Sequence, residues 1–142
     1  MTPQQQQMQQ LASRGVHQPK HHIDDVEHRI QCSCVTWFRF QYPKFAHNLF
    51  AVPNGGKRDK ATAGKLKAEG LLPGVSDLIL LKPNATYSAM LIEMKTPSGE
   101  QSDSQRQWQQ LIQTDGYLYV ICRSLEDFQR EVRQYLASAE SY

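Results

Sequence analysis

Two short apolar runs, each next to charged side chains, constrain the fold of this chain more than any other feature. The first run is Leu-Ile-Leu-Leu at 78–81, and the second is Met-Leu-Ile at 90–92. Runs of this length between turn residues are typical of buried β-strands, and Pro73 with Gly74 supplies a turn before the first. We therefore predict two neighbouring strands that pair as a hairpin.

The charged residues at the ends of these runs are predicted to meet. Side chains alternate along a strand, so Glu93 and Lys95 share one face while Ile92 and Met94 share the other. Hairpin pairing would bring Asp77 to the same end of the sheet. Two nearby carboxylates repel each other unless a divalent cation neutralises them, which indicates a metal site. The alternative is an exposed ion pair of Glu93 with Lys95, and Asp77 as an ordinary turn residue.

The spacing of these residues resembles a known nuclease signature. Asp77 followed by Glu93-Met94-Lys95 is similar to the Asp…Glu-X-Lys pattern of the PD-(D/E)XK nuclease superfamily. The surrounding segments 67–78 and 93–108 contain a Gly-Val-Ser-Asp turn and a Ser-X-X-Gln helix start, and they resemble the VRR-NUC family of virus-type replication and repair nucleases. The likeness runs from about residue 24 to residue 123 and departs at Ser76, where the superfamily name has proline. Since that residue shapes the turn and binds no metal, the exchange changes little.

The resemblance implies roles for the residues of the signature. Asp77 and Glu93 would bind Mg²⁺ or Mn²⁺, helped by the backbone carbonyl of Met94. Lys95 would orient or deprotonate the attacking water, or hold the scissile phosphate. Deprotonation requires a neutral amine, whereas the other two roles do not.

Two further residues carry a role only because of the resemblance. Glu27 would be the acid on the first helix that reaches the metal, directly or through water; without the family it is a surface helix acid. Gln105 would contact Lys95 or a phosphate. It also has a structural explanation, because Ser102 and Gln105 form a capping-box pattern at a helix start.

The remaining segments predict an α/β domain. We expect helices over 24–41, over the basic segment up to about 69, from Ser102 onwards, and from Ser124 onwards, with further strands over 48–52 and 117–122. The helix from Ser102 is expected to bury Trp108, Leu111 and Ile112 and to connect parallel strands. The predicted architecture is a restriction-endonuclease-like core, a mixed four-stranded sheet flanked by helices.

A basic run after the first predicted strand is the candidate nucleic-acid contact. The net charge of +2 is too small to indicate nucleic-acid binding by itself. Lys57, Arg58 and Lys60 follow a Gly-Gly turn, where they would contact backbone phosphates. The alternative is a solvated charged helix face.

Length and composition define the expected domain organisation. The 142 residues are enough for one domain, and the glutamine-rich segment 1–22 lacks the apolar side chains needed to fold. We predict a disordered tail over 1–22 and a VRR-NUC-like nuclease domain over 23–138. No apolar run is long enough to span a membrane, and the start lacks a signal-peptide core, so a cytoplasmic location in a bacterium or infected host cell is expected.

Taken with the resemblance, these features predict a metal-dependent DNA endonuclease of the stand-alone phage or bacterial type. Branched or flap DNA is the expected substrate, and a homodimer is the expected form by family analogy. One alternative is a catalytically silent nuclease-fold module that binds DNA. Another is an enzyme that acts on RNA, although the sequence shows no aromatic platform typical of single-strand RNA readers.

Overall fold

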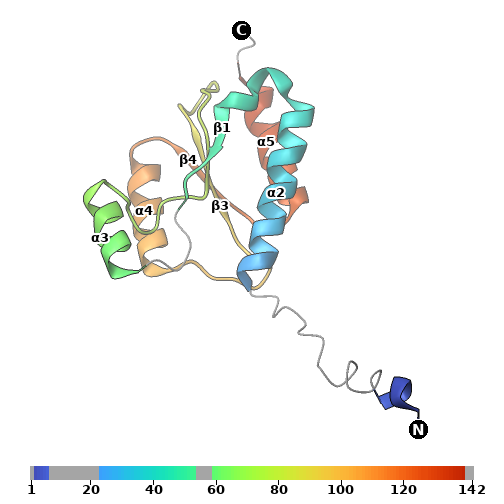
Figure 1. Ribbon diagram of the computed structural model, residues 1–142. Helices are drawn as coiled ribbons and strands as arrows, with labels where there is room; N and C mark the ends of the chain where they lie inside the picture. Colours follow the sequence, from blue (N-terminus) through green and yellow to red (C-terminus); the bar gives the residue numbers. More distant parts are fainter. Residues whose placement is uncertain (1, 7–22, 54–58, 140–142) are drawn as a thin grey trace.

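The computed structural model describes residues 2–6, 23–53 and 59–139 (Figure 1). A helical turn covers residues 3–6. The elements that follow are α2 (Ile23–Gln41), the 3₁₀ helix η1 (Pro43–Asn48), β1 (Leu49–Ala51), α3 (Lys60–Ala68), β2 (Leu78–Leu80), β3 (Met90–Met94), α4 (Asp103–Thr114), β4 (Leu118–Cys122) and α5 (Leu125–Ala137). The predicted α/β class and the predicted order of elements are confirmed.

The four strands form one mixed sheet in the order β1-β2-β3-β4. β1 pairs with β2 and β2 with β3 in antiparallel fashion, whereas β3 and β4 are parallel. The expected hairpin of the two apolar runs is therefore present. α4 connects the two parallel strands, as expected, because parallel neighbours need a long connection.

Helices cover the two faces of this sheet unequally. In Figure 1, α2 and α5 lie on one face, α4 lies on the other, and α3 lies beside α4 on the same side. The α2/α5 face holds a core of twelve buried residues, which includes Phe38 from α2, Ile92 from β3 and Phe128 from α5. The α4 face holds a cluster of only three, Ala89, Leu91 and Tyr119. The main core therefore lies between the sheet and α2/α5.

The helix starts follow local capping chemistry. Ser102 accepts from the Gln105 amide, and the Gln105 side chain accepts from the Ser102 amide, which confirms the predicted capping box of α4. Ser124 caps α5 through the Asp127 amide, again as predicted. These caps place the start of each helix at a defined residue after its strand.

One predicted core residue is exposed. Leu111 was expected to be buried with Trp108 and Ile112, but its side chain is 58% exposed. Trp108 and Ile112 do pack against the α4-face cluster. The prediction was wrong because the small cluster under α4 covers only part of the apolar side of this helix. Leu111 lies on the part that stays exposed.

The predicted tail falls almost wholly outside the structure. Residues 7–22 are not among the described residues, so disorder there stays a prediction, as does the 23–138 domain boundary. Of the helices in the described part of the chain, none combines the length and apolarity needed to cross a membrane.

Candidate active site

Strand register places the two signature carboxylates opposite each other. Leu78 pairs with Ile92 in the antiparallel β2/β3 ladder, so the next residues outwards, Asp77 and Glu93, are cross-strand neighbours. Asp77 is further held by its own hydrogen bonds. Its Oδ2 accepts from the Met94 amide at 2.7 Å, and its carbonyl accepts from the Val52 amide at 2.9 Å. The backbone thus orients Asp77 towards the end of β3.

The turn before Asp77 depends on a glycine. Gly74 has φ +90, a conformation that side chains with a Cβ rarely adopt, and a Cβ there would lie 2.6 Å from the carbonyl carbon and oxygen of Ser104. The turn therefore packs directly against the first turn of α4. Ser76, at the position where the superfamily name has proline, is buried and donates to the Leu78 carbonyl at 3.2 Å.

Glu93 is held in a nearly dry environment. Its side chain is 1% exposed, and its two oxygens accept hydrogen bonds from Gln105 Nε2 at 3.0 Å and Tyr119 Oη at 3.2 Å. Burial, followed by the neighbouring Asp77 carboxylate, raises the pKa of Glu93 to about 9, while the Lys95 charge and the Tyr119 hydrogen bond oppose the rise. Near neutral pH this carboxyl needs either a proton or a cation.

Lys95 belongs to the same charge cluster. Its ammonium is close enough to Glu93 to lower the pKa of that carboxyl, in agreement with the predicted shared strand face. The Lys95 side chain is half-buried, and its amide donates to the Cys122 carbonyl at 3.0 Å, which continues the β3/β4 ladder. The structure thus brings Asp77, Glu93 and Lys95 together, as the sequence predicted.

The loop after Lys95 is tied to the end of β4. Arg123 Nη1 donates to the carbonyls of Thr96 at 2.8 Å and Gly99 at 2.5 Å. The Arg123 amide in turn donates to Asp127 Oδ2 at 3.0 Å, which joins this anchor to α5. Arg123 therefore restrains the chain directly after the signature lysine.

Gln105 has a different partner from the one expected. The sequence predicted a contact with Lys95 or a phosphate, whereas in the structure its amide nitrogen donates to Glu93. The same side chain completes the capping box through its oxygen. One glutamine thus joins the start of α4 to a signature carboxylate.

Tyr119 is the site residue that sequence reasoning missed. It lies on β4 beside Leu91 of the parallel neighbour β3, and its hydroxyl contacts Glu93 two residues further along β3. The sequence does place Tyr119 in a predicted strand, but a tyrosine in a strand is common and does not by itself indicate a site residue. Only the pairing of β3 with β4 shows which carboxylate it meets.

The predicted metal-binding roles of Glu27 and of the Met94 carbonyl are not tested by the contacts in the structure. Glu27 lies half-buried on α2. Within the described residues, no group of three histidine, cysteine, aspartate or glutamate side chains is gathered so as to hold a metal ion, so a role for Glu27 stays a prediction. The Met94 side chain is buried in the α2/α5-face core, as predicted; its carbonyl as a ligand stays a prediction.

The basic run is only partly within the structure. Lys60 is exposed at the first position of α3, and Asp59 caps this helix through the Thr62 amide at 2.6 Å. Lys57 and Arg58 lie outside the described residues. Figure 1 places α3 on the α4 side of the sheet. The Glu93 carboxylate lies on this side as well, because Gln105 of α4 donates to it.

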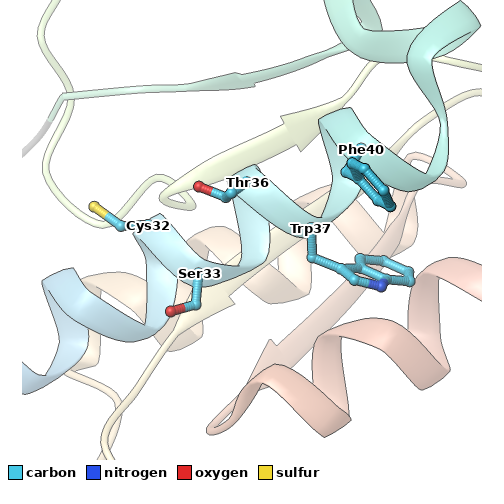
Figure 2. Close-up of a pocket in the computed structure, with 5 residues that line it drawn as sticks. All are labelled: Cys32, Ser33, Thr36, Trp37 and Phe40. Carbon is cyan, nitrogen blue, oxygen red and sulfur yellow. The ribbon is translucent and has the colours of Figure 1, made fainter.

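A hollow on α2 is separate from these residues. It has a volume of about 500 Å³ and is lined by Cys32, Ser33, Thr36, Trp37 and Phe40 (Figure 2). None of the predicted site residues lines it. The candidate active site is therefore defined by its charged side chains and their hydrogen bonds.

Comparison with known proteins agrees with this geometry. A family model of the VRR-NUC domain matches residues 25–126, which is most of the chain. The chain belongs to the VRR-NUC family. A solved structure described as a VRR_NUC domain protein is similar in fold, with a TM-score of 0.71 and 20% identity over 81% of this chain and 91% of the other. No curated protein matches the sequence significantly. VRR-NUC is a nuclease-type family, and the family predicted from the signature is confirmed.

Proposed function

We propose that this VRR-NUC protein is a Mg²⁺- or Mn²⁺-dependent DNA endonuclease that hydrolyses phosphodiester bonds. The observation that carries the proposal is the Asp77 and Glu93 pair, brought face to face by strand register with Lys95 in the same charge cluster. A module that only bound DNA would gain nothing from clustered acids facing a polyanion. Membership of a nuclease-type family supports the same conclusion.

The residues present fit a hard divalent cation. Oxygen donors suit Mg²⁺ and Mn²⁺, and Mg²⁺ is usually bound by one or two carboxylates together with waters and substrate phosphates. Asp77 and Glu93 supply two carboxylates, so a third acid is not required. The Met94 carbonyl, and Glu27 through water, would be additional ligands.

Each side chain then has a defined task in hydrolysis. A bound cation would activate water and offset the charge that develops on the phosphoryl oxygens. Lys95 would orient the attacking water or hold the scissile phosphate, which requires no change in its protonation. Gln105 restrains one oxygen of the Glu93 carboxylate through their 3.0 Å hydrogen bond.

DNA would be held by the basic segment around the start of α3. Lys60, together with Lys57 and Arg58, would contact backbone phosphates, which supply most sequence-independent affinity. Replacing all three by alanine should weaken DNA binding and flatten its salt dependence by about one unit of log–log slope for each phosphate that is no longer neutralised. Binding measured at two salt concentrations tests this; unchanged affinity at both would exclude these residues.

The finer features of the proposal concern substrate and assembly. A single small domain offers limited surface for a duplex, which is the reason for proposing branched or flap DNA and a homodimer acting in phage or bacterial replication, recombination or repair. The cytoplasmic location goes with these substrates and stays a prediction.

The decisive experiment compares cleavage by the wild type and by Lys95→Ala. Labelled linear, flap and four-way DNA would be incubated with Mg²⁺, Mn²⁺ or EDTA, and a single-stranded RNA would be included. Cleavage should require the metal and fall by about 100-fold or more in Lys95→Ala, since removal of one group that stabilises charge in the transition state typically costs about 100- to 1,000-fold. Lys44→Ala, an exposed lysine in η1, is the matched control and should cleave normally. Binding without cleavage in any metal would instead indicate the silent DNA-binding module.

A further inference from the structure

The carboxylate of Glu93 accepts hydrogen bonds from two different secondary-structure elements. Gln105, on α4, donates to Oε1, and Tyr119, on β4, donates to Oε2. A carboxylate held at one oxygen can still rotate about its terminal torsion, which is broad in carboxylic side chains. Donors on both oxygens fix the plane of the group, so Tyr119 adds something that Gln105 alone does not.

A second glutamine determines which way the Tyr119 hydroxyl points. Gln101 Nε2 donates to Tyr119 Oη at 3.2 Å and to Gln109 Oε1 at 2.9 Å, so both hydrogens of its amide group are engaged. Because the phenol oxygen accepts from Gln101, its own hydrogen is available for Glu93. The hydrogen bonds thus run in one direction, from Gln101 through Tyr119 to Glu93.

Packing holds the phenol ring in the same place. Tyr119 is buried, and the Trp108 ring meets it edge-on with centroids 6.1 Å apart. Trp108 and Gln109 both belong to α4, while Gln101 lies directly before its capping residue Ser102. The start and the middle of α4 therefore restrain one tyrosine, and through it one carboxylate of the site.

We propose that Tyr119, oriented by Gln101, is a positioning residue that holds the Glu93 carboxylate in the orientation needed to bind the divalent cation. The inference rests on the proposed metal-dependent function and adds residues from outside the nuclease signature. Hydrogen-bond partners of metal ligands orient those ligands, and their removal typically costs about 10–100-fold in metal affinity or activity. A phenol on the neighbouring strand supports Glu93 in this way.

The test measures metal binding separately from catalysis. Intact wild-type protein and Tyr119→Phe would be titrated with Mn²⁺, with free Mn²⁺ followed by its electron paramagnetic resonance signal, and cleavage would be assayed over the same concentrations. We expect the Mn²⁺ dissociation constant of Tyr119→Phe to rise about ten-fold. Cleavage at saturating Mn²⁺ should return to within a few-fold of wild type. Tyr117→Phe, an exposed tyrosine just before β4, is the matched control and should bind Mn²⁺ like the wild type.

Gln101→Leu tests the chain of hydrogen bonds without altering the buried ring. It should weaken Mn²⁺ binding less than Tyr119→Phe does. The double variant should be no weaker than Tyr119→Phe alone, because Gln101 acts through the tyrosine. Additive effects in the double variant would overturn this order of action.

The outcomes separate this inference from the proposed function. Wild-type protein that neither binds Mn²⁺ nor cleaves DNA would end the proposed function. Metal-dependent cleavage by the wild type, together with unchanged Mn²⁺ affinity in folded Tyr119→Phe and Gln101→Leu, would leave that function standing and overturn the role of Tyr119. Circular dichroism establishes that each variant is folded at the temperature of the titration.

Discussion

The two faces of the same sheet differ in what their buried residues can do. The face under α2 and α5 buries twelve residues, all of them apolar or weakly polar side chains such as Phe38, Ile92 and Phe128. The face under α4 has a three-residue cluster, and next to it lie Glu93 and its hydrogen-bond partners. Apolar burial is the dominant favourable term in folding, so the first face supplies most of the stability.

The α4 face contains a group whose burial lowers the stability of the protein. Metal-free Glu93 is buried beside a second carboxylate, an arrangement that opposes ionisation. The comparison teaches that the large apolar core lies on one face of the sheet and the polar cluster on the other. Changes on the α2/α5 face should then act on stability, and changes on the α4 face should act chiefly on the site.

The largest effect on stability is expected from Phe128→Ala. This residue is fully buried, and its ring lies 6.0 Å from that of Trp37. The truncation should lower the free energy of unfolding by about 3–5 kcal/mol, from the smaller transfer free energy and the cavity left behind. Urea unfolding measures the change. Cleavage per folded molecule should stay near the wild-type value, and a loss of cleavage without a loss of stability would contradict the division between the faces.

Gly74→Ala should affect both stability and cleavage. The substitution combines an unfavourable φ with a Cβ placed 2.6 Å from the Ser104 backbone, so the Asp77 turn and the start of α4 must move apart. We expect a loss of about 1–3 kcal/mol in the free energy of unfolding, together with reduced cleavage.

Gly70→Ala is the control for this change. Gly70 has φ +107, but a Cβ there would meet no atom within 4 Å, so it reports backbone strain without a clash. Thermal unfolding and cleavage assays of both variants isolate the effect of the close approach to Ser104. Equal effects of the two substitutions would show that the turn need not pack against α4.

The pH dependence of stability should reveal how much the ionisation of buried Glu93 destabilises the metal-free protein. With a pKa raised from 4.5 to about 9, the folded metal-free protein keeps a proton that the unfolded chain releases. The stabilisation is complete below about pH 4.5, and stability falls as pH rises through the window up to about 9. Glu93→Gln should flatten this fall and stabilise the metal-free protein by roughly 2 kcal/mol near pH 8. Thermal unfolding in EDTA at several pH values measures it, and identical pH profiles would contradict the raised pKa.

The smallest effect is expected from Leu111→Gln. The side chain is 58% exposed, so the free energy of unfolding should change by less than about 0.5 kcal/mol. Ile112→Gln, one residue further on and packed against the α4-face cluster, should cost clearly more. Urea unfolding of the two variants tests the observed orientation of α4. If Leu111→Gln lowered the free energy of unfolding more than Ile112→Gln does, Leu111 would be buried, as predicted from the sequence.

Local patterns predicted much of the fold and part of the site. The apolar runs, the turn at Gly74 and the Ser102 capping box each act over a few residues, so they could be recognised without the tertiary structure. The face-to-face placement of Asp77 and Glu93 also followed, since alternation and a hairpin are sufficient to bring them together. The burial of Leu111 was wrongly predicted, because periodicity shows which face is apolar but not how much of it is covered.

By itself, the sequence determined the order of strands and helices, the signature residues and the strand face that they share, because these depend on alternation, turn chemistry and capping between near neighbours. Only the tertiary structure decided that Gln105 donates to Glu93 and not to Lys95 or a phosphate. It also decided that Tyr119, oriented by Gln101, donates to the second oxygen of Glu93. Those hydrogen bonds join Glu93 to residues 12 and 26 positions further along the chain. They exist because β4 returns parallel to β3 beneath α4, and no local pattern specifies which side chains that packing brings together.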